Sequence, residues 1–197
     1  MLTATYTLVA LSVEQAKVRS SLQSLQQLLE TNFIHQSSLT PGQVSYACDA
    51  VKRLYESCHW RKLDMFLIPA IRKATSGADE LLGTLDQLGH AAAEAVGVLA
   101  IRLGSVAIDT AARVAQFCDA VDAFCSATLR RLDIEENSLF PVARAVISGE
   151  AWFSIANQML AHDAYVQESR PIKPVRLFAE PPAEAGQSHR SDAHLVH

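Results

Sequence analysis

Two prolines interrupt otherwise helical stretches of this sequence, and their surroundings match. A shift of 72 residues superposes two sets of identical residues: Leu67, Pro69 and Arg72 fall on Leu139, Pro141 and Arg144. Proline inside a helix removes a backbone hydrogen bond and clashes with the preceding turn, so it is uncommon there. Its presence in two equivalent frames predicts a helical chain built from two related halves.

Apolar residues recur at helical spacing and predict four long amphipathic helices followed by a short fifth one. The first helix begins at Leu11 and carries a heptad stripe in which Gln15 is the only polar member. Thr40 and Pro41 form a good N-cap and first-turn pair for the second helix. The second to fifth helices are expected at residues 41–74, 78–103, 108–146 and about 150–161. This pattern predicts an all-α fold, an antiparallel four-helix bundle with a short extra C-terminal helix covering one end.

The helical pattern predicts one folded domain with an extension on each side. Residues 11–165 carry the pattern, and a chain of 197 residues with 49% hydrophobic content is long enough for one packed core. Residues 1–10 are mildly apolar, and we interpret them as a strand-like or irregular N-terminal arm. From residue 171 onward, prolines alternate with charged and small residues, which predicts a disordered tail.

Charge and composition argue against several classes of function. The formal net charge of −4 is spread along the chain and supplies no basic patch, so no nucleic-acid partner is expected. No apolar run reaches the roughly 18 residues of a membrane span, and the first residues lack the pattern of a signal peptide. The cysteines lie in apolar helical surroundings without zinc-site spacing, at Cys48, Cys58, Cys118 and Cys125. We therefore expect a cytoplasmic protein with reduced thiols and no membrane partner.

Helical phase brings a few polar side chains to the inside of the predicted bundle. Arg131 and Glu135 lie one turn apart on the apolar face of the fourth helix. A charged pair in an apolar stripe requires a reason, because such side chains are almost never buried without a partner. Tyr55 and His59 face inward from the second helix by the same criterion.

The same criterion directs other polar residues away from the inside. Asp64 lies about 140° from His59 on the second helix, so it faces solvent or the edge of a neighbouring helix. In the third helix, Gly89 is nearer the apolar stripe, and His90 lies almost opposite it.

Four stretches resemble the motifs of the haemerythrin-like (HHE) family. They are residues 11–15, 59–69, 81–90 and 131–141, and the last, with Glu135-Glu136-Asn137 before Leu139-Phe140-Pro141, is the nearest match. The resemblance covers roughly residues 8–165 and implies a four-helix bundle. In that family the bundle holds two irons, which two glutamates bridge and histidines cap, and the centre binds oxygen or nitric oxide or senses iron.

Carried over position by position, the resemblance keeps two of the family's ligands. His59 and Glu135 stand where the family has histidine and glutamate. The other positions differ: histidines are replaced at Gln15, Arg131 and Gly89, and the second glutamate is replaced at Leu63. The third-helix histidine would be His90 if that helix were rotated by one residue. A guanidinium at a ligand position adds a permanent positive charge that opposes metal entry, so an intact di-iron centre is not expected.

The first functional hypothesis is a non-enzymatic binding or regulatory module without a cofactor. Arg131 then takes the place of the metal charge and pairs with Glu135, while His59, Tyr55 and Gln15 fill the remaining hydrogen bonds. No other stretch combines a nucleophile with a base or pairs two catalytic carboxylates, so no enzyme is expected. The partner is an unidentified protein or small ligand. In a simpler alternative, Arg131 extends to solvent at the helix edge.

The second hypothesis is an iron-binding sensor of oxygen, nitric oxide or redox state with a reduced ligand set. Two histidines and one carboxylate can hold a single iron, and His59, His90 and Glu135 would supply them. The apolar phase nevertheless places His90 on the outside of its helix, where an ordinary surface histidine is the simpler interpretation.

Overall fold

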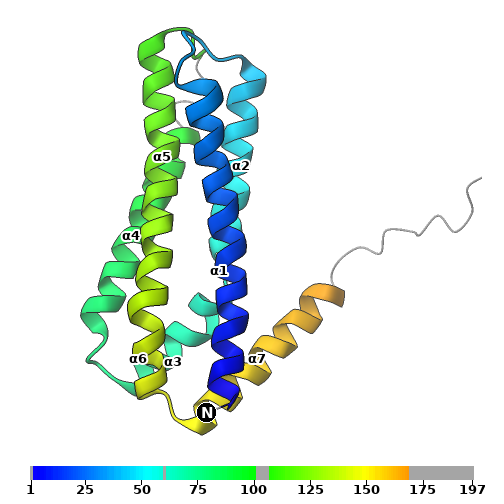
Figure 1. The fold of residues 1–197 in the computed structure, drawn as a ribbon, viewed down its shortest axis with the longest axis vertical. Helices are drawn as coiled ribbons and strands as arrows, with labels where there is room; N and C mark the ends of the chain where they lie inside the picture. The colour runs from blue at the N-terminus through cyan, green and yellow to red at the C-terminus, as the bar shows by residue number, and fades with distance from the viewer. Residues whose placement is uncertain (1, 60, 101–106, 169–197) are drawn as a thin grey trace, which may run out of the picture.

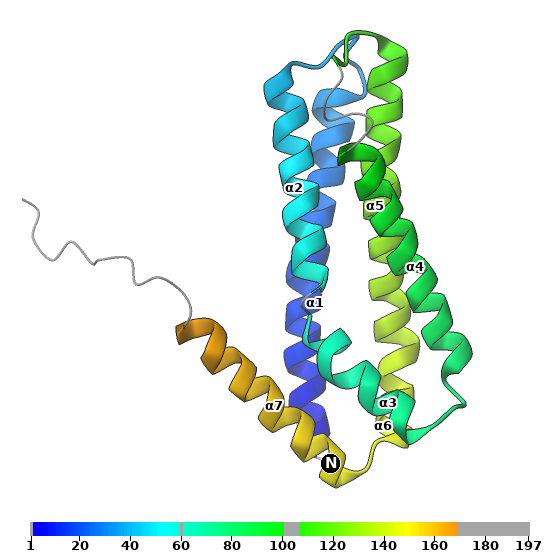
Figure 2. The ribbon, with the colours of Figure 1, turned by 180° about the vertical axis from the view of Figure 1, so that it is seen from behind.

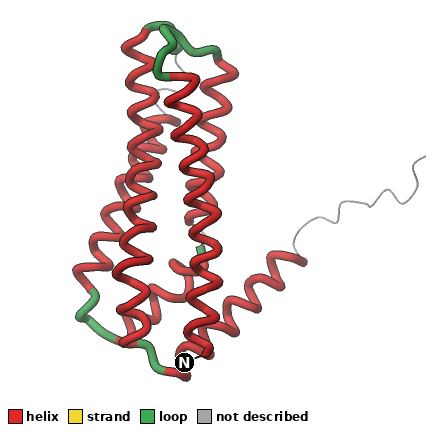
Figure 3. The backbone as a smooth tube through the Cα atoms, in the orientation of Figure 1, coloured by secondary structure: helices red, strands yellow, loops and turns green. Residues whose placement is uncertain are grey.

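The computed structural model describes residues 2–59, 61–100 and 107–168, with the side chain of His59 excepted. Within these ranges every regular element is a helix, as Figure 3 shows. The fold class predicted from the sequence, all-α, is therefore confirmed. Residues 171–197, predicted to be a disordered tail, lie outside the described residues.

Helix α1 spans Leu2–Leu28 and continues into a π-helical turn, η1 (Leu29–Phe33). The predicted heptad stripe is buried, including its polar member Gln15. The interpretation of residues 1–10 as a strand-like or irregular arm is wrong, because residues 2–10 are the first turns of α1. Leu8 is buried and extends the three-four spacing of the stripe by one position toward the N-terminus, which explains why the helix continues there.

Helix α2 (Pro41–His59) begins with the expected cap. The Gln43 backbone N–H donates to Thr40 Oγ1 at 3.3 Å, and the Thr40 N–H donates to Gln43 Oε1 at 2.8 Å, which makes a reciprocal capping box. The predicted continuous helix over 41–74 is wrong, because helical structure is interrupted at Arg61. The chain resumes as a π-helical turn, η2 (Leu63–Leu67), and then as α3 (Ile68–Ala74).

The prolines of the sequence repeat occupy identical places in the structure. Helix α5 (Ala111–Ile134) is followed by the π-helical turn η4 (Glu135–Leu139) and by α6 (Phe140–Val146). A shift of 72 residues superposes η2 on η4 and α3 on α6, and each proline is the second residue of its short helix. The wider turn before each proline accommodates its ring and its missing N–H.

The remaining helices lie close to their predicted ranges. Helix α4 spans Asp79–Val98, and the predicted end of this helix falls among residues 101–106, outside the described residues. Thr110 caps α5 by accepting a hydrogen bond from the Arg113 N–H at 3.3 Å. Helix α7 spans Gly149–Glu168 and is therefore longer than the short helix expected at 150–161.

Helices α1, α2, α4 and α5 run along the long axis of the molecule (Figures 1 and 2). The short helices α3 and α6 lie at one end, where α7 also begins before it departs at an angle from the others. Helix α7 packs against α1 and η2, and α4 packs along α5.

The apolar interior consists of two clusters stacked along this axis. The upper cluster joins the C-terminal half of α1 to α2, α4 and α5, and it includes Val18, Ala92 and Leu132. The lower cluster joins the N-terminal half of α1 to η2, α3, α4, η4, α6 and α7, and it includes Leu11, Leu85 and Leu139. Along α1 the two clusters are separated around Gln15, and from α5 into η4 they are separated around Glu135.

None of the described helices combines the length and hydropathy needed to cross a bilayer. The four cysteines are free thiols, and burial raises the pKa of each of them, that of Cys125 to about 12. A raised thiol pKa lowers the fraction of reactive thiolate at neutral pH. This supports the assignment of the cysteines as packing residues.

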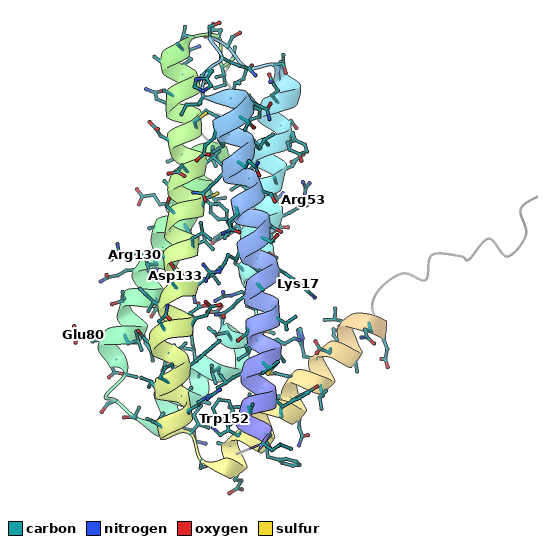
Figure 4. The ribbon with its side chains drawn as sticks, viewed as in Figure 1. Lys17, Arg53, Glu80, Arg130, Asp133 and Trp152 are labelled. Carbon is teal, nitrogen blue, oxygen red and sulfur yellow. The ribbon has the colours of Figure 1, made fainter. Side chains whose placement is uncertain are left out.

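Helix α7 is attached to the lower cluster through Trp152, whose side chain is 3% exposed and lies where α7 begins (Figure 4). Replacing Trp152 by Ala should lower the free energy of unfolding by about 3–5 kcal/mol, because it leaves a large cavity in that cluster. Phe153 is the matched control, since its side chain is 61% exposed. Phe153→Ala should stay within about 0.5 kcal/mol in urea unfolding. Equal losses would contradict this packing of α7.

Candidate functional site

Glu135 is the centre of the polar layer between the two clusters. It is the first residue of η4, and its side chain is 0% exposed. Gln15 of α1 donates a hydrogen bond from Nε2 to Glu135 Oε2 at 2.8 Å, and Arg61 donates from Nη2 to Glu135 Oε1. Both carboxylate oxygens are therefore paired, as a buried charge requires.

Arg61 reaches Glu135 because the backbone leaves the helical path at this residue. Its side chain is only 2% exposed, and besides Glu135 it contacts Asp64 through Nε at 3.3 Å and through Nη2 at 3.4 Å. Burial by itself lowers the pKa of the Arg61 guanidinium, but the charge and hydrogen bond of Glu135 and the charge of Asp64 outweigh burial and raise the pKa. Arg61 is therefore a permanent buried cation.

Arg131 completes the arrangement from α5. Its Nη2 donates to Asp64 Oδ1, and its Nε lies 3.0 Å from Glu135 Oε1, where the N–H does not have hydrogen-bond geometry. The backbone of α4 approaches this guanidinium at Gly89, where an added Cβ would lie 3.3 Å from Arg131 Nη1. Glycine at this position therefore makes room for the arginine.

These contacts form a closed ring of alternating charge: Arg61, Glu135, Arg131 and Asp64. We call these four residues the ionic ring. Two guanidinium groups and two carboxylates balance each other, so the ring carries no net charge. Exposure increases around the ring, from Glu135 and Arg61 in the interior to Arg131 and Asp64, whose side chains are 18% and 25% exposed.

Further ion pairs surround the ring at the same height. Arg19 of α1 contacts Asp133 at 2.7 Å and Glu136 at 3.0 Å, and thereby links α1 to the end of α5 and to η4. Lys62 contacts Asp163 of α7 at 2.7 Å. By contrast, Lys17 of α1 and Arg130 of α5 extend away from each other (Figure 4). Outer ion pairs of this kind stabilise a protein by at most about 1 kcal/mol each.

A pocket opens from the ring to the outside between α2, η2, α4 and α5. Its volume is about 600 Å³, within the range of small-molecule sites. The ring residues Arg61, Asp64 and Arg131 form part of its lining. Apolar and small residues from α4 and α5 supply much of the remaining wall, including Gly89, Ala92, Ala93 and Phe124.

The structure brings together three of the residues selected from the sequence: Gln15, Arg131 and Glu135. Tyr55 lies on the pocket wall, and Glu135 receives its hydrogen bonds from Gln15 and Arg61 instead. The side chain of His59 lies outside the described residues, so its predicted inward position stays a prediction.

Contacts decide two alternatives that the sequence left open: which side of α4 His90 faces, and whether Arg131 of α5 extends to solvent. His90 is exposed, and its Nδ1 lies 2.7 Å from the Asp86 backbone oxygen in the preceding turn, as expected for a surface histidine. Arg131 does not extend freely to solvent, because it contacts both carboxylates of the ring.

Sequence reasoning missed Arg61, and it left Asp64 facing either solvent or the edge of a neighbouring helix; Asp64 contacts Arg131 of α5 with its side chain 25% exposed. Arg61 was missed because residues 41–74 were assumed to form a single helix. The apolar stripe of α2 ends near Cys58, and the next buried leucine is Leu63, five residues later, with Leu67 and Ile71 following at steps of four. A step of five does not fit a continuous helical face. That change of phase was the available signal for the break at Arg61.

The described side chains around the ring do not fit an iron centre. Both oxygens of Glu135 accept hydrogen bonds, and two guanidinium groups lie against the carboxylate where cations would have to bind. Within the described ranges, no group of three or more histidine, cysteine, aspartate or glutamate side chains is arranged to hold a metal ion.

Comparisons with known proteins provide no further guidance on this site. No family model matches the sequence, no curated protein matches it, and no solved structure matches the fold.

Removing Arg61 should destabilise the protein more than removing Arg131. Arg61→Met removes the cation that donates a hydrogen bond to the fully buried Glu135, which then keeps only the hydrogen bond from Gln15 and the Arg131 contact that lacks hydrogen-bond geometry. Breaking a buried pair costs about 3–5 kcal/mol. Arg131→Met leaves Glu135 paired with Arg61 and Gln15, so the loss should be nearer 1.5–3 kcal/mol, as for hydrogen bonds to charged groups. Urea unfolding at neutral pH measures both losses.

A matched control for these variants is Arg72→Met. Arg72 pairs with Asp86 at 2.8 Å on the surface, where both side chains are about half exposed, so its loss should stay below about 1 kcal/mol. Adding Glu135→Gln to Arg61→Met should restore part of the stability, because no charge is then stranded. An Arg61→Met variant as stable as Arg72→Met would contradict the ring.

Glu14 should make stability depend on pH. Burial raises its pKa above the ordinary value of 4.5, although the nearby charges of Lys62 and Arg61 and a hydrogen bond from the Lys62 backbone act in the opposite direction. The folded protein thus holds this proton more tightly than the unfolded chain. The resulting stabilisation is present below the ordinary pKa and is lost as pH rises through the raised one.

Glu14→Gln removes this titration, so the variant should gain stability relative to the parent as pH rises from 4.5 to 7. Unfolding in urea at the two pH values measures this change. The exposed Glu30 supplies the control variant Glu30→Gln, which should show no such gain. A constant difference between Glu14→Gln and the parent at both pH values would contradict the assignment.

Proposed function

We propose that this chain is a haemerythrin-like four-helix bundle in which the ionic ring takes the place of the di-iron centre. We further propose that it acts as a non-enzymatic binding module. One observation carries the proposal: Glu135, at the family's ligand position, is fully buried and held by Arg61, Arg131 and Gln15. The repeated arrangement of π-helical turn, proline and short helix in the two halves supports the relationship.

The pair of residues Gly89 and Arg131 supports the idea of replacement. Both stand where the resemblance implies histidines, one on α4 and one on α5. The small residue on one helix accommodates the large residue on the other, and the guanidinium contacts the carboxylate that a metal would otherwise neutralise. A ring of this kind keeps the centre of the bundle ordered without a cofactor, because each buried charge has a partner inside the protein.

Binding fits the site better than catalysis. The charged groups at the inner end of the pocket are committed to one another, so none of them is poised as a general acid or base. The pocket combines a polar end with an apolar wall, which is the usual composition of a small-molecule site. We therefore place the binding function in this pocket.

Elemental analysis of protein purified from iron-fed cells tests this proposal against the iron-binding sensor. We expect iron far below one atom per chain in the parent and in His90→Ala alike. Because His90 is exposed, His90→Ala should also change the free energy of unfolding by less than about 0.5 kcal/mol. Stoichiometric iron in the parent that is lost in His90→Ala would contradict the proposal and favour a sensor with a reduced ligand set.

A further inference from the structure

Asp64 is the member of the ionic ring that is most easily displaced. Its side chain is 25% exposed and belongs to η2, at the inner end of the pocket. Glu135, by contrast, has no exposed surface and is also held by Gln15. Rotation of the Asp64 carboxylate toward solvent therefore requires little rearrangement, whereas displacement of Glu135 would strand a charge in the interior.

Two arginines converge on the carboxylate of Asp64. Arg61 contacts Asp64 Oδ2 through Nε and Nη2, and Arg131 donates to Asp64 Oδ1. Guanidinium groups recognise carboxylates through such multiple contacts. A further donor of Arg61, Nη1, is buried without a hydrogen-bond partner among the described residues, so the arginines have more donors than the two carboxylates occupy.

Beside this anion position the pocket offers apolar surface, although Tyr55, Asp86, His90 and Thr128 also belong to its lining. Phe124 and Leu88 supply apolar surface, and Ala92 and Ala93 leave space next to them. A ligand that replaces one carboxylate of the ring by another keeps the ring neutral. A dianion in the same place would leave an excess negative charge in a partly buried site, which is unfavourable.

We propose that the pocket binds a small monocarboxylate with an apolar body, and that its carboxylate takes the position of Asp64 between Arg61 and Arg131. Asp64 then acts as an internal competitor that occupies the anion position when no ligand is bound. This inference deepens the binding function proposed above and rests on it.

Chemical rescue of Asp64→Ala tests the inference, because this variant empties the anion position. Benzoate and propionate serve as probes, and benzamide and propionamide are their uncharged counterparts; the thermal unfolding midpoint is measured at constant ionic strength. A ligand that binds only the folded state raises this midpoint, and the rise grows with the logarithm of ligand concentration above the dissociation constant. We expect both carboxylates to raise the midpoint of Asp64→Ala, benzoate at lower concentration, while the amides and inorganic phosphate do not.

Two further proteins provide controls. The parent should need a concentration of benzoate on the order of tenfold higher for the same rise of the midpoint, because Asp64 competes for the arginines. The double variant Arg131→Met with Asp64→Ala should lose the rescue, because one of the two arginines is missing. Equal responses to benzoate and benzamide, or full rescue of the double variant, would overturn the inference.

A second substitution covers the case in which Asp64→Ala fails to fold. Asp64→Asn keeps the volume of the side chain, and benzoate binding to it is measured by titration calorimetry, with tighter binding than to the parent expected. Weaker or equal binding would count against the inference. Iron content measured on the same preparations keeps the two proposals distinguishable: stoichiometric iron contradicts the proposed function, whereas missing rescue in iron-free protein contradicts only the carboxylate site.

Discussion

The burial of one carboxylate, that of Glu135, explains much of the irregular geometry in this protein. An ionised carboxylate without water or partners is too costly to bury, so the fold must bring compensating groups to it. The chain leaves its helical path at Arg61 to supply one cation, and Gly89 leaves space for another at Arg131. Gln15 stands at a position of the α1 stripe where an apolar residue would otherwise pack, and it donates a hydrogen bond to the other carboxylate oxygen.

The two halves of the chain accommodate their prolines in the same way, but they differ in the residues that come before. In both, a π-helical turn precedes the proline and a short helix follows it. Only the first half is interrupted beforehand, at Arg61, whereas α5 runs without a break into η4. The half that supplies the buried carboxylate is thus continuous into its π-helical turn, and the half that supplies the buried cation is interrupted at that residue. Internal repetition of sequence therefore does not imply equal roles for equivalent positions.

The sequence was sufficient to predict features that depend on helical period, and it was insufficient where the period changes. The stripe of α1 and the inward positions of Arg131 and Glu135 follow from spacing alone, because an uninterrupted helix fixes the direction of each side chain. Arg61 and Asp64 could not be placed in this way, since a break of the backbone rotates everything that follows it. The helical state of residues 2–10 depended on contacts of Leu8 within the lower cluster, which short-range pattern does not reveal.

The position of the ionic ring between two apolar clusters also fixes the alignment of the long helices. Apolar side chains are largely interchangeable contacts, so a uniform hydrophobic interior would allow one helix to slide past its neighbours by a turn, about 5.4 Å. Here such a slip would carry Glu135 into the leucines of one cluster and leave Arg61 without its acid. A single polar layer thus sets the axial register of these long helices, as one buried polar residue does in coiled coils.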